Sequence, residues 1–126
     1  MSDVAIIQIE ANDLIEAEVG DSDDLRVGEW VMAIGSPFGL HLNHTVTKGI
    51  VSARGRNDVI SRLNYEDFIQ HDAAINPGNS GGAMVNLFGE LIGINTMNVS
   101  IGGGSDGIGL AVPSNLVRKI TEQIIK

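Results

Sequence analysis

A serine in a segment rich in glycine and asparagine is the residue whose surroundings best suit chemistry. Residues 76–83 read NPGNSGGA and place Ser80 between residues that tolerate unusual backbone dihedral angles. Such a turn can present the hydroxyl and direct backbone N–H groups to one point. Acyl transfer needs this arrangement, because negative charge develops on the former carbonyl oxygen. The amides of Gly78 and Ser80, which flank Asn79, could supply both donors of an oxyanion hole.

The same glycine-rich residues also fit a solvated turn without a catalytic role. A phosphate-binding loop is disfavoured, because no lysine follows the glycines and no change from strand to helix is indicated there. The sequence has no cysteine, which excludes disulfide scaffolds and thiolate zinc sites. We expect neither a metal nor a cofactor.

Length and charge narrow the class of protein. At 126 residues the chain suits one compact domain, whereas enzymes built from two β-barrels commonly reach about 200 residues or more. A formal charge of −8 disfavours binding to nucleic acid or anionic lipid, because phosphate binding needs clustered cations. No apolar run approaches the length of a membrane span, and the first residues lack the pattern of a signal peptide.

Short apolar and β-branched runs separated by glycines predict an all-β domain. The predicted strands cover residues 4–9, 30–34, 45–47, 49–52, 68–70, 83–85, 90–96 and 108–112. Residues 86–89 predict a hairpin turn, and residues 54–64 predict a long exposed loop. The 16 glycines favour a barrel, whose tight corners need positive φ. Only the last segment has helical spacing, and Ser114 is its predicted N-cap.

Four segments, in this order along the chain, carry a resemblance to a known family. They are SDVAIIQI at 2–9, AIGSPFG at 33–39, DAAINPGNSGGA at 72–83 and GELIGINT at 89–96. Together they closely resemble the protease domain of the HtrA (Deg) family of trypsin-like serine proteases. The resemblance implies a chymotrypsin-like fold of two β-barrels, of which this chain would hold the C-terminal part.

On that resemblance we expect three regions. Residues 1–22 would be a remnant strand of the first protease barrel, residues 23–112 the six-stranded second barrel, and residues 113–126 a C-terminal helix. The resemblance implies Ser80 as the nucleophile and Asp3 as the aspartate of the triad. By position alone, Asp3 equally fits a solvated carboxylate beside a fraying terminus.

The histidine base is the main departure from the family pattern. In the family it precedes the aspartate, and no histidine precedes Asp3 in this sequence. His41 and His44 are expected in a surface loop, and His71 is expected to have a structural or supporting role. A serine without a base is a poor nucleophile, so the chain alone is expected to be inactive.

Substrate binding can also be inferred from the resemblance. Ala74, six residues before Ser80, would form the floor of the specificity pocket with Ile75 beside it. Neither residue is acidic, so the pocket should prefer small or medium apolar side chains to lysine or arginine.

Two further segments are assigned by the same resemblance. Asn95, Thr96 and Met97 would bind an extended substrate as an added β-strand, although they also fit an ordinary edge strand. The loop at 54–64 resembles the regulatory loop of these enzymes. Arg56 is the candidate relay residue there, and an exposed arginine without such a role is the alternative.

The function implied is that of a serine endopeptidase acting on unfolded or misfolded proteins in the periplasm or cell envelope. Its expected partners are a peptide substrate, the missing N-terminal barrel and further copies of the chain, since the family forms trimers. The alternative is a non-catalytic barrel that binds extended peptides or self-associates, because absence of the first barrel would expose apolar surface.

Overall fold

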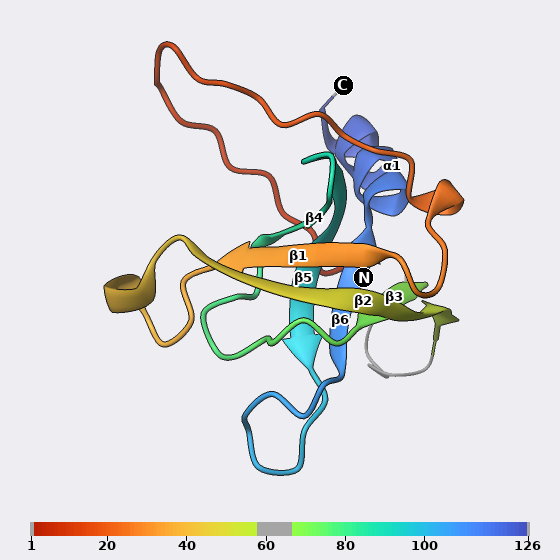
Figure 1. Ribbon diagram of the computed structural model, residues 1–126. Coiled ribbons are helices and arrows are strands. Elements are labelled where there is room, and N and C mark those ends of the chain that lie inside the picture. The colour runs from red at the N-terminus through yellow and green to blue at the C-terminus, as the bar shows by residue number, and fades with distance from the viewer. Residues whose placement is uncertain (1, 58–66, 126) are drawn as a thin grey trace.

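A computed structural model describes residues 2–57 and 67–125 of the chain. Its centre is a closed antiparallel barrel with the strand order β1-β2-β3-β6-β5-β4 (Figure 1). The strands are β1 (Trp30–Gly35), β2 (Thr45–Arg56), β3 (Phe68–His71), β4 (Ala83–Asn86), β5 (Leu91–Asn98) and β6 (Gly109–Pro113). Two short 3-10 helices, η1 (Ser22–Asp24) and η2 (Leu40–Leu42), and one helix, α1 (Ser114–Ile124), complete the structure. The predicted all-β class, the six-stranded barrel and the terminal helix are confirmed.

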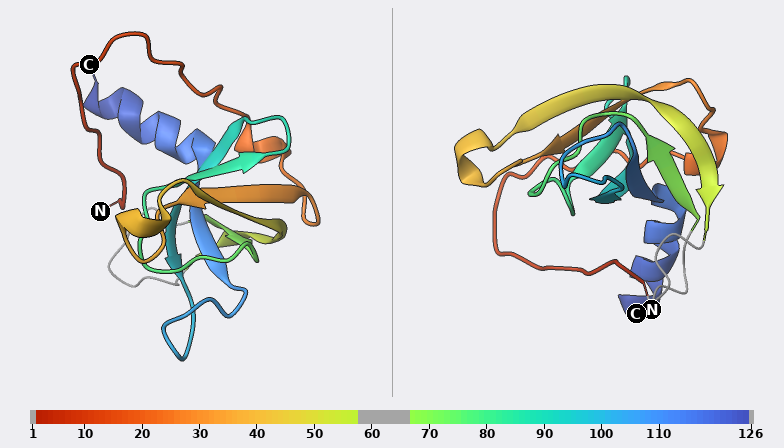
Figure 2. Two further views of the ribbon diagram at one scale, coloured as in Figure 1. Left: turned by 60° about the vertical axis from the view of Figure 1, so that its left-hand side comes forward. Right: turned by 90° about the horizontal axis from the view of Figure 1, so that it is seen from below.

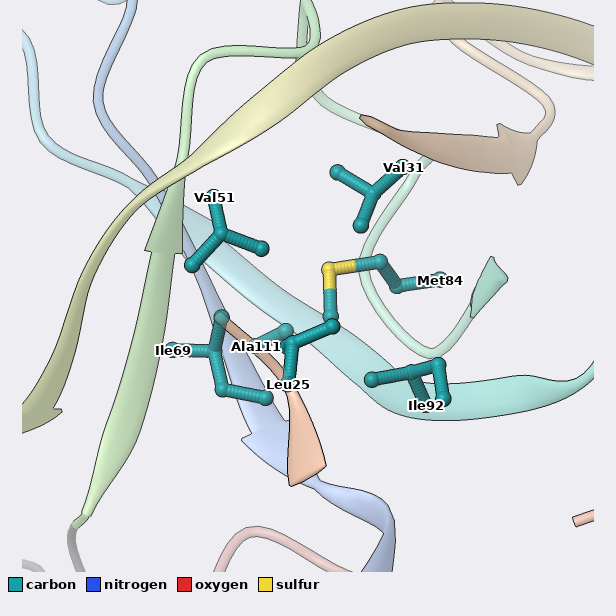
Figure 3. Packing of buried hydrophobic residues seen from close by; sticks show 7 residues of the cluster. All are labelled: Leu25, Val31, Val51, Ile69, Met84, Ile92 and Ala111. Atoms are coloured by element: carbon teal, nitrogen blue, oxygen red, sulfur yellow. The ribbon is translucent and has the colours of Figure 1, made fainter. Parts of the chain in front are cut away.

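The apolar runs become strands because each buries one face inside the barrel. The main core cluster consists of Leu25, Val31, Val51, Ile69, Met84, Ile92 and Ala111. These side chains come from all six strands and from the segment after η1, and they converge in the barrel interior (Figure 3). A large apolar side chain buried in this way stabilises the fold by about 1.5–3 kcal/mol. The barrel therefore provides a rigid support for the loops between its strands.

Strand β2 is longer than the sequence indicated. The two predicted segments at 45–47 and 49–52 form one strand, in which Lys48 pairs with Met32 and Gly49 with Val31 of β1. Residues 54–56, predicted as the start of a loop, continue this strand as far as Arg56. Residues 58–64 of the predicted loop lie outside the described residues.

The predicted strand at residues 4–9 does not form. No strand is assigned within residues 2–18, and the first pairing of the chain is an isolated parallel bridge between Val19 and Leu91. Residues 2–18, which we call the N-terminal arm, follow a wide arc (Figures 1 and 2). Its first residues contact the barrel, where Val4 packs against the cluster of Phe68, Leu110 and Val112. The physical reason is that a strand needs a paired neighbour for its N–H and C=O groups, and in the described structure no strand pairs with residues 4–9.

Helix α1 packs against β5, β6 and η1, but its start differs from the prediction. Pro113 occupies the N-cap position, so the expectation that Ser114 caps the helix is wrong. The hydroxyl of Ser114 instead donates to the carbonyl of Gly20 at 2.9 Å. The amide of Asn115, in the first turn of the helix, donates to the hydroxyl of Ser22 at 3.0 Å. A cap for the helix is thus supplied by a residue 93 positions away in sequence.

A third hydrogen bond joins the same two segments. The side-chain amide of Asn115 donates to Asp21 Oδ1 at 2.7 Å. This bond, together with the N–H of Asp23, lowers the pKa of Asp21 below its ordinary value. We call these contacts the clasp, defined as Gly20, Asp21 and Ser22 against Ser114 and Asn115.

Within the described residues, no helix has both the length and the apolar character to cross a membrane.

Candidate active site

Ser80 lies on a tight turn in the loop between β3 and β4, with its side chain exposed. Gly78 and Gly81 on either side of it have φ values of 109° and 85°. A Cβ atom on Gly78 would lie 2.1 Å from the carbonyl oxygen of Ser36. Only glycine therefore fits at position 78, both for its dihedral angle and for the close approach.

The segment that follows β1 holds this turn in place. The amide of Ser36 donates to the carbonyl of Gly78 at 3.3 Å, and the amide of Phe38 donates to the carbonyl of Pro77 at 2.6 Å. Both carbonyls of the turn are thereby engaged on the side facing residues 36–38. The arrangement fixes the peptide planes that decide where the amides of the turn point.

The backbone amides around Ser80 divide into two groups. Those of Asn79, Gly81 and Gly82 donate to the carbonyls of Asn76, Asn95 and Asn79 at 3.1, 2.7 and 2.9 Å. Within the described residues, the amides of Gly78 and Ser80 have no acceptor. Of the predicted oxyanion-hole residues, Gly78 and Ser80 therefore keep a free donor. The amide of Asn79 is already engaged, and its side chain is buried beneath the turn.

Thr96 connects Ser80 with Asp3. The Ser80 hydroxyl donates to the carbonyl oxygen of Thr96 at 2.6 Å, and the Thr96 hydroxyl donates to Oδ2 of Asp3. Asp3, Ala5, Ser80 and Asn95 all contribute to one cleft with a volume of about 410 Å³. The two predicted catalytic residues, far apart in sequence, are thus brought to the same cleft.

Ala74 and Ile75 lie between β3 and the turn that carries Ser80. The carbonyl of Ala74 accepts a hydrogen bond from the Thr47 hydroxyl at 2.9 Å, and the side chain of Ala74 is half-buried. Ile75 is only 2% exposed and packs with Ala33 and Ala73 in a small apolar cluster. Ile75 faces the interior. The cleft beside Ser80 is lined by described residues other than these two, so the pocket assigned to Ala74 and Ile75 stays a prediction.

The end of β5 has one side free of a strand partner. β4 pairs with β5 only as far as Ile94, opposite Ala83, whereas β6 pairs with β5 as far as Asn98. Beyond Ile94, the β4 side of β5 contacts the turn itself, through Asn95 and the Thr96 carbonyl. The half-buried residues Thr96 and Met97 therefore lie where an extended peptide could be added.

The three histidines lie apart from the Ser80 hydroxyl. His41 in η2 and His44 after it are exposed, as expected for a surface loop. His71 in β3 is fully buried, and its Nε2 lies 3.0 Å from Oδ1 of Asn95. Burial lowers the pKa of His71 below its ordinary value. The Asn95 hydrogen bond and the nearby Asp72 carboxylate act in the opposite direction, but their effect is smaller. In the described residues, the Ser80 hydroxyl has Thr96 as its partner and no histidine.

The remaining predicted residue, Arg56, ends strand β2. Its Nε donates to Oε1 of Gln70 in β3 at 3.0 Å, and the side chain is exposed. In the described ranges, no group of three or more His, Cys, Asp or Glu side chains is placed to hold a metal ion.

Comparison with known proteins identifies the family of the chain. Residues 1–94 match the family model described as a trypsin-like peptidase domain, so the chain belongs to the trypsin-like peptidases. Within that class its relatives are HtrA-type proteases. It is 56% identical over 126 residues to the periplasmic serine endoprotease DegP of Escherichia coli K12, covering 99% of this chain and 26% of DegP. It is 55% identical to a probable serine protease do-like of Buchnera aphidicola, with the same coverage.

Solved structures give the same result. The HtrA-type protease AlgW with decapeptide superimposes with a TM-score of 0.88 at 51% identity, over 94% of this chain and 35% of AlgW. A serine endoprotease from Yersinia pestis gives a TM-score of 0.77 at 42% identity, over 94% of this chain and 38% of that protein. The chain spans about a quarter of the length of the curated relatives named above (26%).

The contacts that join the turn to the barrel were not predicted from the sequence. Asn95 was assigned only to substrate binding, yet it is 1% exposed and hydrogen-bonds to residues directly after Ser80. His71 was left without a stated partner. The sequence shows only an asparagine and a histidine within predicted strands. They are 24 residues apart, and this separation alone does not indicate that their side chains are in contact.

Proposed function

We propose that the chain is the C-terminal part of the protease domain of an HtrA-type serine endopeptidase, with Ser80 as the nucleophile. The observation that carries the proposal is the turn itself. Ser80 is exposed beside a cleft, the free amides of Gly78 and Ser80 flank it, and Thr96 connects it to Asp3.

In the proposed reaction, Ser80 Oγ attacks the carbonyl carbon of a peptide bond while its proton passes to a histidine base. The oxyanion of the tetrahedral intermediate is stabilised by the amides of Gly78 and Ser80. Protonation of the amine leaving group then yields an acyl-enzyme on Ser80, which water hydrolyses. Asp3 would hold the histidine ring in orientation and stabilise its charged form.

We propose that the base is supplied by the first protease barrel, outside these 126 residues. The Ser80 hydroxyl donates to Thr96, a neutral carbonyl that cannot take up its proton. Removal of one triad member leaves only a small residue of activity. The 126 residues alone are therefore expected to be inactive.

The proposed substrate is an extended segment of an unfolded protein. It would align along Thr96 and Met97 of β5, because the backbone of Asn95 already bonds to Gly81 and Gly82, and it would place a small or medium apolar side chain near Ala74 and Ile75. Support comes from the side of β5 that has no strand partner beyond Ile94 and from the apolar cluster of Ala33, Ala73 and Ile75, two of which are neighbours of Ala74 in sequence. Structures of AlgW were solved with a bound peptide, a decapeptide in one and a tripeptide in another.

Three further assignments belong to the same proposal. Arg56 would relay signals from its loop to the cleft, and its hydrogen bond to Gln70 connects it to β3. The chain would act in the periplasm, as DegP does by name, and would assemble as a trimer together with its first barrel.

A fluorophosphonate probe tests the proposal directly. The chain is incubated with the probe alone and after addition of a segment carrying the first barrel, and labelling is read by intact-mass spectrometry. We expect labelling of Ser80 only in the mixture. The Ser80→Ala variant should show no labelling and should lose only about 0.5–1.5 kcal/mol of stability, for the one hydrogen bond it removes. Absence of labelling in a correctly assembled mixture would refute the assignment.

The apolar residues of the N-terminal arm favour a second candidate, a self-associating barrel. Ile7, Ile9, Leu14 and Ile15 are all exposed, and Ile15 is 99% exposed. Exposed apolar side chains in an unpaired extended segment promote strand exchange between chains. A mass that rises with concentration in light scattering, without labelling of Ser80, would favour this role over catalysis.

A further inference from the structure

A buried histidine holds the residues that follow Ser80, although it takes no part in the proposed reaction. The contact is made through Asn95, next to Thr96 in β5. Oδ1 of Asn95 lies 3.0 Å from His71 Nε2, and Nδ2 of Asn95 donates to the carbonyl of Ala83 at 3.1 Å. The side chain of Asn95 thus joins strand β3 to the first residue of β4.

The backbone of Asn95 binds the same stretch of chain. Its carbonyl accepts a hydrogen bond from the amide of Gly81 at 2.7 Å, and its amide donates to the carbonyl of Gly82 at 2.9 Å. Asn95 therefore hydrogen-bonds to three consecutive residues, Gly81, Gly82 and Ala83. These are the residues that set the position of Ser80 relative to β5.

This geometry assigns the proton on the histidine ring. Because Nδ2 of Asn95 donates to Ala83, the atom facing His71 is the amide oxygen, which can only accept. His71 must therefore carry a proton on Nε2. Its Nδ1 is buried without a hydrogen-bond partner in the described structure, so a second proton there would have no acceptor.

The surroundings of the ring offer little compensation for a positive charge. Val51 of β2 and Gly109 of β6 pair with His71, and a Cβ on Gly109 would lie 2.8 Å from the ring. Within the described residues, the charged group acting on the ring is the exposed carboxylate of Asp72, whose Oδ1 also accepts from the amide of Ile50. The ring is fully buried, so charging it is costly.

We propose that His71 is a positioning residue, which in its neutral, Nε2-protonated form fixes Asn95 and through it the turn that carries Ser80. The protonated ring keeps its Nε2–H, but it carries a buried charge and a second proton that has no acceptor in the described structure. Protonation therefore destabilises this arrangement and makes the geometry of the turn sensitive to acid. The role assigned to the turn rests on the proposed function, but the contact itself is a property of the fold.

The direction of the pH effect follows from the pKa. Burial lowers the pKa of His71 in the folded chain below its ordinary value of about 6.5. The neutral ring is thus favoured by folding, and its contribution to stability is fully present above about pH 6.5. The contribution is lost as the pH falls from about 6.5 towards the lowered pKa, because the unfolded chain binds the proton first.

Nitrogen NMR of the full chain tests the proposal with two variants. His71→Gln keeps an N–H that can donate to Asn95 and cannot be protonated, whereas His71→Leu removes the donor. The exposed His41 and His44 provide reference signals.

We expect a proton on Nε2 of His71 at about pH 7.5. We also expect backbone signals of Gly81 and Gly82 that are shifted in His71→Leu but restored in His71→Gln. On acidification, the native signals of the turn should persist to lower pH in His71→Gln than in the unaltered chain.

Three results would overturn the proposal. One is a proton on Nδ1 of His71 in place of Nε2. Another is a His71→Leu variant in which the Gly81 and Gly82 signals are unchanged. The last is loss of the turn signals at the same pH in His71→Gln and the unaltered chain. If His71→Leu does not fold, the comparison of His71→Gln with the unaltered chain on acidification still tests the proposal. No catalysis is needed for these signals, so a failed labelling experiment and a failure here are distinct results.

Discussion

Replacement of Gly78 by alanine should destabilise the chain through two separable effects. The first is conformational, because a residue with a Cβ is strained at the φ of 109° found here, at a cost of about 1–3 kcal/mol. The second is steric, because the new Cβ would lie 2.1 Å from the carbonyl oxygen of Ser36. Relief of that contact requires the segments at 36–38 and 77–78 to move apart.

The size of the steric effect can be derived from the contacts that such movement breaks. The hydrogen bonds from Ser36 to Gly78 and from Phe38 to Pro77 join the two segments. At about 0.5–1.5 kcal/mol each, their loss adds about 1–3 kcal/mol. Gly78→Ala should therefore lower the free energy of unfolding by about 2–6 kcal/mol, a large part of the roughly 5–15 kcal/mol typical of a folded domain.

Gly39 provides a matched control. Its φ of 103° is nearly that of Gly78, but no atom lies within 4 Å of a Cβ built there. Gly39→Ala should therefore carry the conformational cost alone, about 1–3 kcal/mol. Urea unfolding can be followed by the fluorescence of Trp30, the one tryptophan of the chain. If Gly78→Ala proved no more destabilising than Gly39→Ala, the close packing of the turn on residues 36–38 would be refuted.

Three further substitutions test the core and the clasp. Met84→Ala, at a fully buried position, should lower the free energy of unfolding by about 2–5 kcal/mol in the same urea assay. Leu87→Ala in the exposed hairpin turn should change it by no more than about 0.5 kcal/mol, and similar values for both would contradict the assigned core. Ser22→Ala should cost about 0.5–2 kcal/mol in thermal melts followed by circular dichroism, because the amide of Asn115 loses its cap. An unchanged melting temperature would show that water replaces the hydroxyl.

The strands of the barrel could be predicted because their signals are local. Apolar runs ended by glycine or by a turn gave β1, β4, β5 and β6 to within one or two residues. The strand predicted at residues 4–9 does not form, and the prediction of Ser114 as the N-cap of α1 is wrong. A strand at residues 4–9 would need a neighbouring strand to pair with. The first turn of α1 is capped by Ser22, which only folding brings next to Asn115.

In the candidate site too, features with a local sequence signal could be predicted, and features that depend on tertiary contacts could not. Ser80 and its flanking glycines were found because a strained turn has a recognisable composition. Asp3 was found only through the resemblance to a family, since nothing in its own surroundings distinguishes it. The link from His71 through Asn95 to Ala83 was not found, because it joins three strands and depends on the register of the closed barrel.

The clasp also bears on the order of events during folding. Its hydrogen bonds join residues 93 or 94 positions apart, so they close nearly the whole described chain into one loop. Closure of so long a loop is entropically costly before the intervening strands have assembled. The clasp should therefore form after the rate-limiting step, and its loss should speed unfolding while leaving the folding rate nearly unchanged. The lifetime of the native state, rather than the speed of its formation, is then what Ser22 and Asn115 govern.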